Sequence, residues 1–273
     1  MSYNCIVKKQ STKENIMKEF ENKTVLSTGA ASGMGFLMCK RYVEEGGNAV
    51  LCEINPEALD RAVAEINAIR EGSAIGVVCD VRDYEQVCNA RDKAVEAFGS
   101  IDVLTHFAGG AETRVHGIPS SIEFPDVPIE IYDWGLDVNL RGQIYFDHAV
   151  LKQMREQKSG LIVHIGSITG QEGSGHNISY SASKSAAMGG LTKAIAQYGA
   201  KYGIRSMCVS PGPVLTREAM ANMRTMLARA AEPEEIIDFV IFLASDKGQF
   251  FNGTNVLIDG GRDAMERRKY GDK

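Results

Sequence analysis

The segment VLSTGAASGMGF, residues 25–36, is the strongest indication of the fold in this sequence. An apolar, strand-like run leads into a turn that carries Gly29, Gly33 and Gly35, and a helical pattern follows. Glycines in such a turn allow a tight bend, let a pyrophosphate approach the backbone closely, and leave free N–H groups at a helix N-terminus. The stretch therefore predicts a dinucleotide-binding turn between the first strand and the first helix.

The rest of the chain repeats the same alternation of strand and helix. Strict alternation with apolar strands favours a parallel sheet covered by helices on both faces. Right-handed crossovers make the first three strands one mononucleotide-binding half. The expected strands are 23–28, 48–53, 74–79, 102–107, 160–165, 204–210 and 255–258. The expected helices are 33–46, 56–70, 84–98, 130–156, 180–202 and 233–245.

These elements predict one α/β domain with a doubly wound (Rossmann) fold and a seven-stranded parallel sheet. No repeat, low-complexity linker or shift in composition marks a second domain. We place this Rossmann-fold domain at residues 22–262, with an N-terminal extension at 1–21 and a C-terminal tail at 263–273.

The composition is that of a soluble globular protein, with 44% hydrophobic and 24% charged residues in 273. A net charge of −5 argues against a surface for nucleic acid or anionic membranes. No apolar run approaches the ~20 residues of a membrane span, and the N-terminus lacks a secretory signal. The six cysteines include no C-x-x-C pair, which fits reduced thiols. We expect a cytoplasmic protein.

An acidic residue follows the second expected strand. Glu53 lies at the end of that strand, where a carboxylate can accept hydrogen bonds from the adenosine ribose and would repel a 2′-phosphate. No Arg or Lys lies in the glycine turn or just after Glu53 to attract that phosphate. The pattern therefore favours NAD(H) over NADP(H).

The segment YSASK, residues 180–184, pairs a phenol with an ammonium group. One such pair could be ordinary helix surface, but residues four apart share a helix face. A phenol with a pKa of about 10 is a poor base at neutral pH. A cation about 4 Å away, at an effective dielectric near 20, favours the phenolate by roughly 4 kcal/mol. The spacing therefore predicts that Lys184 lowers the pKa of Tyr180 to near 7, where it can act as a general acid and base.

Taken in order, the motifs resemble the short-chain dehydrogenase/reductase family from about Asn22 to Gly261. The matching segments are TGAASGMG (28–35), CDV (79–81), FAG (107–109), DWGLDVNL (133–140), IVHIGS (162–167), YSASK (180–184), SPGPVLT (210–216) and IDGG (258–261). Where the family has Asn-Asn-Ala-Gly, this chain has HFAG, which puts in question a hydrogen bond that braces the sheet there. His106 and His164 are expected to be core histidines.

The resemblance implies a catalytic tetrad of Asn139, Ser167, Tyr180 and Lys184. Ser167 would donate to the substrate oxygen, and Asn139 would hold a water that links Lys184 to solvent. The residues implied to bind the cofactor NAD(H) are Gly29, Ser32, Gly33, Met34, Gly35, Glu53, Ile54, Asp80, Val81, Phe107, Ala108, Gly109, Tyr180, Lys184, Pro211, Gly212, Val214 and Thr216. No cluster of His, Asp or Glu has metal-ligand spacing in the sequence, so no metal is predicted.

Two irregular segments, 109–129 and 211–232, follow expected strands and should emerge at the carboxyl edge of the sheet, where ligands bind. They could also be plain surface loops. Compared with the family, the first looks longer and the second shorter, which suggests a reduced lid and an entrance for a bulky alcohol such as a steroid or a sugar derivative. His116 and His176 lie in such loops and could touch a substrate.

The expected function is NAD(H)-dependent interconversion of a secondary alcohol and a ketone by hydride transfer, with Tyr180 as the general acid and base. One alternative is a 3-oxoacyl-thioester (acyl carrier protein) reductase, against which Glu53 weighs because that reduction generally uses NADPH. Another is a non-catalytic dinucleotide-sensing protein, which would be expected to have lost Ser167, Tyr180 or Lys184. Family analogy implies a homotetramer with a small-molecule substrate and no nucleic-acid partner.

Overall fold

A computed structural model of the chain describes residues 18–265, so most of the predicted extension and tail lies outside the described residues. One parallel sheet runs through it in the order β3-β2-β1-β4-β5-β6-β7. The strands are β1 (Thr24–Thr28), β2 (Asn48–Glu53), β3 (Ala74–Val78), β4 (Val103–His106), β5 (Gly160–Ile165), β6 (Ile204–Pro211) and β7 (Asn255–Ile258). All seven confirm the sequence prediction, and the order reverses between β1 and β4.

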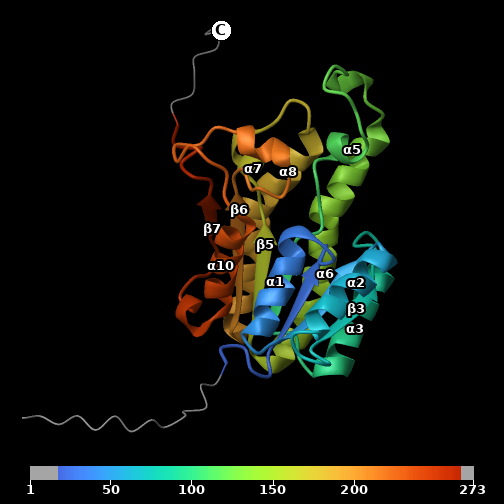
Figure 1. The fold of residues 1–273 in the computed structure, drawn as a ribbon, viewed down its shortest axis with the longest axis vertical. Helices are drawn as coiled ribbons and strands as arrows, with labels where there is room; N and C mark the ends of the chain where they lie inside the picture. The colour runs from blue at the N-terminus through green and yellow to red at the C-terminus, as the bar shows by residue number, and fades with distance from the viewer. Residues whose placement is uncertain (1–17, 266–273) are drawn as a thin grey trace, which may run out of the picture.

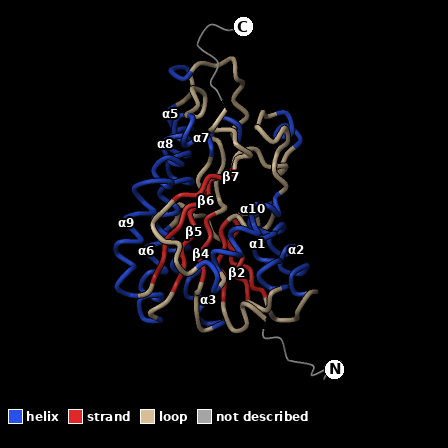
Figure 2. Tube along the Cα trace, turned by 90° about the vertical axis from the view of Figure 1, so that its left-hand side faces the viewer, coloured by secondary structure: helices blue, strands red, loops and turns tan. Residues whose placement is uncertain are grey.

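Helices cover both faces of the sheet, as Figures 1 and 2 show. One face carries α1 (Gly33–Glu44), α2 (Pro56–Asn67) and α10 (Pro233–Ala244), and the other carries α3 (Tyr84–Phe98), α6 (Gly142–Gln157) and α9 (Thr192–Gly199).

The strands are apolar on both sides because each face has its own core. Side chains alternate between the faces along a strand, so Val25 of β1 joins the core under α1 while its neighbour Leu26 joins the core under α6. Both side chains are fully buried. Burial on both faces explains why the strands read as continuous apolar runs rather than as an alternating pattern.

Capping residues set the helix ends that the sequence predicts. Asn55 accepts a hydrogen bond from the N–H of Ala58 at 2.9 Å at the start of α2, and Pro56 occupies its first turn. Gly99 ends α3 with φ near +80°, a left-handed conformation that glycine adopts without strain. None of the helices described is long and apolar enough to cross a membrane.

Short helices gather at the carboxyl edge of the sheet, at the top of Figure 1. They are α4 (Glu112–Val115), α5 (Ile129–Leu136), α7 (Ile168–Glu172) and α8 (Ile178–Ala186), with 3-10 helices η1 (Phe124–Asp126) and η5 (Glu218–Asn222). The segments expected as loops, 109–129 and 211–232, therefore contain α4, η1 and η5, and η5 is the only helix in the latter.

Each of the two longest expected helices is interrupted by a π-helical turn. The segment expected at 130–156 is interrupted by η2 (Asp137–Arg141), which lies between α5 and α6. The segment expected at 180–202 is interrupted by η3 (Ala187–Leu191), which lies between α8 and α9. Two 3-10 helices complete the set: η4 (Ala200–Tyr202) follows α9, and η6 (Asp246–Gly248) follows α10. Turns of this kind are frequent at functional sites.

Candidate active site

The glycine turn forms a cradle that a side chain would fill. A Cβ atom added at Gly29, which has a φ of +61°, would lie 2.8 Å from the backbone of Ala108. A Cβ at Gly35 would lie 2.4 Å from the carbonyl oxygen of Gly29. The N-cap residue Ser32 makes no side-chain capping bond to α1, so no cap side chain competes for the first N–H groups. These features fit a bound pyrophosphate.

A cavity of about 590 Å³, here called the glycine-turn cavity, extends from this cradle past the end of β2. The residues predicted to bind the cofactor at this end all line it: Gly29, Ser32, Gly33, Met34, Gly35, Glu53, Ile54, Asp80, Val81, Phe107, Ala108 and Gly109. The structure thus brings together residues from the ends of four strands, β1 to β4.

Glu53 presents a fixed carboxylate to the glycine-turn cavity. Its Oε1 accepts hydrogen bonds from the N–H groups of Ile54 at 2.9 Å and Asn55 at 3.2 Å, and within residues 18–265 it forms no ion pair. Arg82 also lines this cavity and was not among the residues predicted from the sequence. Arg82 donates to both carboxylate oxygens of Asp80, at 2.9 and 3.0 Å, and holds the pKa of Asp80 below its usual range.

A second cavity of about 460 Å³, here called the Tyr180 cavity, adjoins the first. Ser167, Tyr180 and Lys184 line it, as do the residues predicted for the nicotinamide end: Pro211, Gly212, Val214 and Thr216. Met34, Phe107, Gly109 and Thr216 line both cavities. Ligands in the two cavities would therefore meet beside these shared residues.

Tyr180 and Lys184 lie on the same side of α8, as their spacing predicts. The Lys184 Nζ atom lies 5.5 Å from the centre of the Tyr180 ring and donates a hydrogen bond to the carbonyl oxygen of Ile165 at 2.7 Å. Ser167 caps α7 by accepting from the N–H of Thr169 at 3.1 Å, and its hydroxyl also lowers the pKa of Tyr180 by hydrogen bonding. One hydroxyl thus both caps the helix after β5 and acts on the phenol.

The expected lowering of the Tyr180 pKa by Lys184 is wrong. Burial raises the pKa of Tyr180, and the influences that lower it are first the Ser167 hydrogen bond and then the charges of Arg114 and Arg217. Burial also lowers the pKa of Lys184 to about 8. Lys184 is 4% exposed and its ammonium is bonded to a backbone carbonyl, so desolvation decides its ionisation rather than its distance from the phenol.

Asn139 lies behind the Tyr180 cavity rather than in its wall. The side chain is fully buried in η2. Its Oδ1 accepts from the N–H of Gly110 at 3.0 Å, and its Nδ2 donates to the carbonyl oxygens of Gly110 at 3.0 Å and Gly135 at 2.9 Å. Both amide N–H bonds are therefore used by the protein, and the side chain cannot also donate to a relay water.

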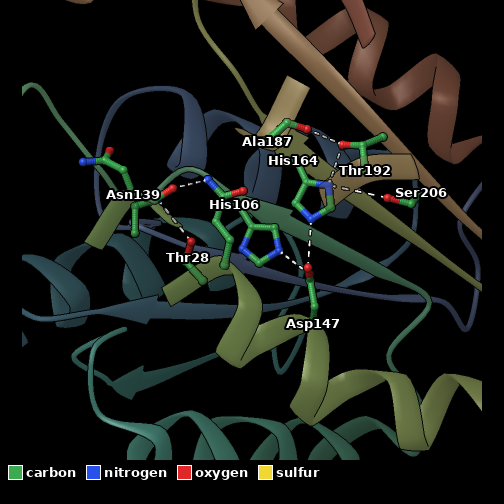
Figure 3. Close-up of polar contacts among 10 residues, drawn as sticks. Thr28, His106, Asn139, Asp147, His164, Ala187, Thr192 and Ser206 are labelled. Carbon is green, nitrogen blue, oxygen red and sulfur yellow. Dashed lines mark hydrogen bonds and ion pairs between the residues drawn. The ribbon is translucent and has the colours of Figure 1, made fainter. Parts of the chain in front are cut away.

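Two histidines share a buried carboxylate beside the site, as Figure 3 shows. His106 of β4 and His164 of β5 each place Nε2 at 2.9 Å from a different oxygen of Asp147 on α6. The pKa of Asp147 is about 2; burial raises it, and the two imidazoles lower it more. A carboxylate accepts only, so both rings donate. His106 thus braces the sheet where the family resemblance put such a bond in question.

These three residues also lie close enough to hold a metal, with candidate ligand atoms within 4.8 Å of one another. Sequence spacing did not reveal the cluster because its members come from three elements. The 2.9 Å contacts are hydrogen bonds that would have to be given up for a metal to enter. Full burial of all three side chains supports a structural role.

The segment 109–129 contributes a residue that sequence reasoning missed, Glu112. Its side chain is buried, and its two carboxylate oxygens accept from the N–H groups of Ser179 at 3.0 Å and Tyr180 at 3.2 Å, in the first turn of α8. Neighbouring Thr113 donates to the N-cap residue Asn177 at 2.6 Å. The segment is thus bound to the helix that carries Tyr180.

Arg114 and Arg217 also line both cavities and were missed. The signal was available, since each lies in one of the two segments marked as irregular. His116 and His176 line neither cavity; the Nδ1 atom of His116 lies 2.9 Å from the carbonyl oxygen of Glu112, and its ring lies edge-on to Trp134.

Comparison with known proteins agrees with this geometry. The model of a family described as short chain dehydrogenase matches residues 23–227. The chain belongs to the short-chain dehydrogenase family. It is 34% identical over 260 residues to meso-2,3-butanediol dehydrogenase of Serratia marcescens, covering 90% of this chain and 97% of that protein.

Other members of the short-chain dehydrogenase family are similarly close. The chain is 30% identical to 7alpha-hydroxysteroid dehydrogenase of Bacteroides fragilis, with 90% of this chain and 96% of that protein covered. It is 33% identical to 3-oxoacyl-[acyl-carrier-protein] reductase of Thermotoga maritima, with 88% and 98% covered. The solved structure of NAD+-bound xylitol dehydrogenase superposes with a TM-score of 0.81 at 29% identity, over 89% of this chain and 100% of that one.

Proposed function

We propose that this short-chain dehydrogenase interconverts a secondary alcohol and a ketone with NAD(H). The observation that carries the proposal is that Ser167, Tyr180 and Lys184 line a cavity that adjoins the glycine-turn cavity. A nicotinamide cofactor, when bound, supplies or accepts the hydride. The chain must then orient the substrate and move one proton.

In this proposal Tyr180 moves the proton at the substrate oxygen. Its phenol gives a proton to the oxygen of a ketone that is being reduced, and its phenolate takes one from an alcohol that is being oxidised. Ser167 accepts from Thr169 through its lone pairs, so its own O–H stays available to donate to the phenolate or to the substrate oxygen. The Lys184 ammonium donates one hydrogen bond to the carbonyl oxygen of Ile165 and places a positive charge near the phenol.

Asn139 acts as a positioning residue in this scheme. A Cβ at Gly109 would lie 2.4 Å from the Asn139 Oδ1 and 3.7 Å from the Lys184 Nζ. The backbone at Gly109 therefore fits tightly between the two side chains. By holding Gly110 through two hydrogen bonds, Asn139 fixes the wall of the Tyr180 cavity next to Gly109, which lines both cavities.

Glu53 supports NAD(H) as the cofactor, and it also weighs against the alternative of a 3-oxoacyl-thioester reductase. Its carboxylate at the end of β2, which forms no ion pair within residues 18–265, would accept from ribose hydroxyls and repel a 2′-phosphate. We expect wild-type activity to prefer NAD(H). Glu53→Ala should lower kcat/KM for NAD about tenfold or more and narrow the preference over NADP, since one hydrogen bond to a charged group contributes roughly 1.5–3 kcal/mol. A wild-type preference for NADP(H) would refute this assignment.

The function itself is tested with a panel of secondary alcohols, including polyols, hydroxysteroids and 3-hydroxyacyl esters. Each is assayed with NAD while the absorbance of the reduced cofactor is followed. We expect turnover with at least one class and its loss in Tyr180→Phe. A dinucleotide sensor would bind the reduced cofactor and give no turnover with any of them.

We also propose a homotetramer, by analogy with the family. Phe250 before β7 is fully exposed, as a side chain at a subunit interface would be in an isolated protomer. Sedimentation velocity at micromolar concentration distinguishes a tetramer of four 29.7 kDa chains from a monomer.

A further inference from the structure

The Tyr180 cavity is positively charged in a chain that is negatively charged overall. The chain carries a net charge of −5, yet the charged residues that line this cavity in the described part of the chain are Arg114, Lys184 and Arg217, with no Asp or Glu. A cleft lined by charges of one sign raises the local concentration of ligands of the other sign. The positive charge of this cavity in a negatively charged chain therefore indicates an anionic ligand.

The two arginines come from separate segments and lie within electrostatic reach of each other. Arg114 belongs to α4, and Arg217 follows Thr216 at the start of η5. Partial burial lowers the pKa of Arg114, and the charge of Arg217 lowers it further. Two like charges brought together weaken the fold unless an anion lies between them.

Neither guanidinium has an acidic partner in residues 18–265. The Nη2 atom of Arg217 lies 3.5 Å from the sulfur of Met220. A thioether sulfur is only a weak acceptor. Arg114 folds over the backbone of Gly110, where an added Cβ would lie 2.8 Å from its Nη2. By contrast, Arg229 and Arg262, in the same part of the fold, each pair with a glutamate. The donors of Arg114 and Arg217 are therefore available to a ligand.

Arg114 and Arg217 lie close enough to Tyr180 for their charges to affect its ionisation. Both positive charges act on the phenol of Tyr180, and both residues line the junction of the two cavities. A group bound by them would lie in the same cavity as a substrate oxygen at Tyr180. Guanidinium groups bind planar carboxylates and phosphates through paired hydrogen bonds.

We propose that Arg114 and Arg217 bind an anionic group of the substrate, a carboxylate or a phosphate, so that the enzyme acts on a hydroxy acid or a phosphorylated alcohol and the matching oxo compound. This inference rests on the proposed function. It narrows the expected class of bulky alcohols to those that carry a negative charge near the reacting carbon.

The cofactor pyrophosphate is the competing occupant, because both arginines also line the glycine-turn cavity. Two observations favour the substrate. The glycine turn and the uncapped start of α1 already provide a pyrophosphate cradle. The arginines also act on the ionisation of Tyr180, the group that meets the substrate rather than the pyrophosphate.

The test compares substrates in pairs that differ only in charge. Hydroxy acids are assayed against their methyl esters or amides, and phosphorylated alcohols against the free alcohols, so that the two sources of negative charge are separated. We expect kcat/KM to be at least 30-fold higher for the anionic member. In Arg114→Gln/Arg217→Gln this preference should fall to within threefold, chiefly through KM, while Arg61→Gln, an exposed arginine on α2 away from both cavities, should keep it.

Cofactor affinity is measured in the same variants. Trp134 is the only tryptophan in the chain and lines the glycine-turn cavity, so quenching of its fluorescence reports binding of reduced cofactor. We expect the dissociation constant to change less than threefold in the double variant. A large rise in this constant with an unchanged charge preference would assign the arginines to the pyrophosphate and overturn the proposal.

The remaining outcomes keep the two proposals separate. Equal turnover of neutral and anionic members would overturn the anion site while leaving the oxidoreductase activity standing. If no compound is turned over, or if Tyr180→Phe stays active, the proposed function fails. The anion site is then tested by a binding measurement instead of by turnover. A carboxylate or phosphate compound should then raise the unfolding temperature of the protein with reduced cofactor bound, in wild type but not in the double variant; no difference would overturn the site.

Discussion

At the scale of single residues, the site depends on charges held out of water. Lys184 is almost fully buried, with a backbone carbonyl as its hydrogen-bond acceptor. Burial lowers its pKa from 10.5 to about 8. Such a group costs stability at neutral pH, where the folded protein must hold a proton that the unfolded chain holds more easily.

We predict that Lys184→Met abolishes activity without lowering stability. Keeping the lysine charged at pH 7 costs roughly 3 kcal/mol, which offsets the hydrogen bond that the variant loses. Between pH 8 and 10.5 the unfolded chain binds more protons at this position, so the wild type should gain stability relative to the variant as pH rises. Urea unfolding at pH 7 and pH 9.5 measures both effects. A variant that is clearly less stable at pH 7 would contradict the argument.

We predict that Ser167→Ala raises the pKa of Tyr180. The Ser167 hydrogen bond is the largest influence that lowers this pKa. Alcohol oxidation needs the phenolate, so its rate should rise with pH through this pKa, and the rising limb should move to higher pH in the variant. We expect kcat at pH 7 to fall 10²–10³-fold. An unchanged limb in the pH profile would show that Ser167 does not act on Tyr180.

At the scale of elements, the segment 109–129 both lines the cavity and holds α8. Glu112 and Thr113 of α4 bond to the first turn and the N-cap of α8. A carboxylate at a helix N-terminus is favoured by the free N–H groups and the helix dipole. The helix that carries Tyr180 is thus capped by a residue 68 positions away.

We predict that Glu112→Ala lowers kcat at least tenfold with little change in KM for the cofactor. The variant leaves two N–H groups at the start of α8 without their acceptor, which costs about 1–3 kcal/mol, and it loosens Tyr180. Glu123→Ala is the matched control, because Glu123 is exposed in the same segment and lines neither cavity. An equal fall in kcat in both variants would show that Glu112 does not position Tyr180.

At the scale of the whole molecule, a buried cluster of one carboxylate and two imidazoles joins two neighbouring strands of the sheet to a helix. Asp147 of α6 holds His106 of β4 and His164 of β5, and His164 also contacts Thr192 of α9 at 3.0 Å (Figure 3). The residues that follow these two histidines in the chain belong to the site: Phe107 comes directly after β4, and Ile165, whose carbonyl accepts from Lys184, is the last residue of β5. The cluster therefore fixes the sheet edge on which the site is built.

We predict that this cluster makes the fold sensitive to acid. The pKa of Asp147 is about 2 instead of 3.8, so it stabilises the fold by roughly 2 kcal/mol above pH 4, and this is lost as pH falls towards 2. Burial lowers the pKa of His106, so the unfolded chain gains protons below about pH 6.5 and stability falls there too.

Urea unfolding of Asp147→Asn between pH 3 and pH 7 measures the effect. We expect a loss of about 3–5 kcal/mol at pH 7, with a shallower fall below pH 5 than in the wild type. Asp238→Asn is the control, because it removes an exposed partner of Arg41. The same pH dependence in wild type and Asp147→Asn would contradict the account.

The elements and the chemistry of the local motifs follow from residues that are close together in the chain. Helix and strand periods, caps and glycine turns depend on residues close together in the chain, so all seven strands, the glycine turn and the shared face of Tyr180 and Lys184 could be predicted. Spacing alone led to the wrong pKa for Tyr180, because it gives a distance along a helix and not the burial that decides ionisation.

The side chains that surround those motifs depend on the three-dimensional fold. Strand order and loop paths bring Glu112, Arg114 and Arg217 to Tyr180, and they place Asp147 between two histidines, 41 residues from one and 17 from the other. No local period encodes such contacts, because they depend on which strands are neighbours and how far each loop reaches. The charge of the cavity, and with it the class of substrate that we propose, therefore follows from the fold.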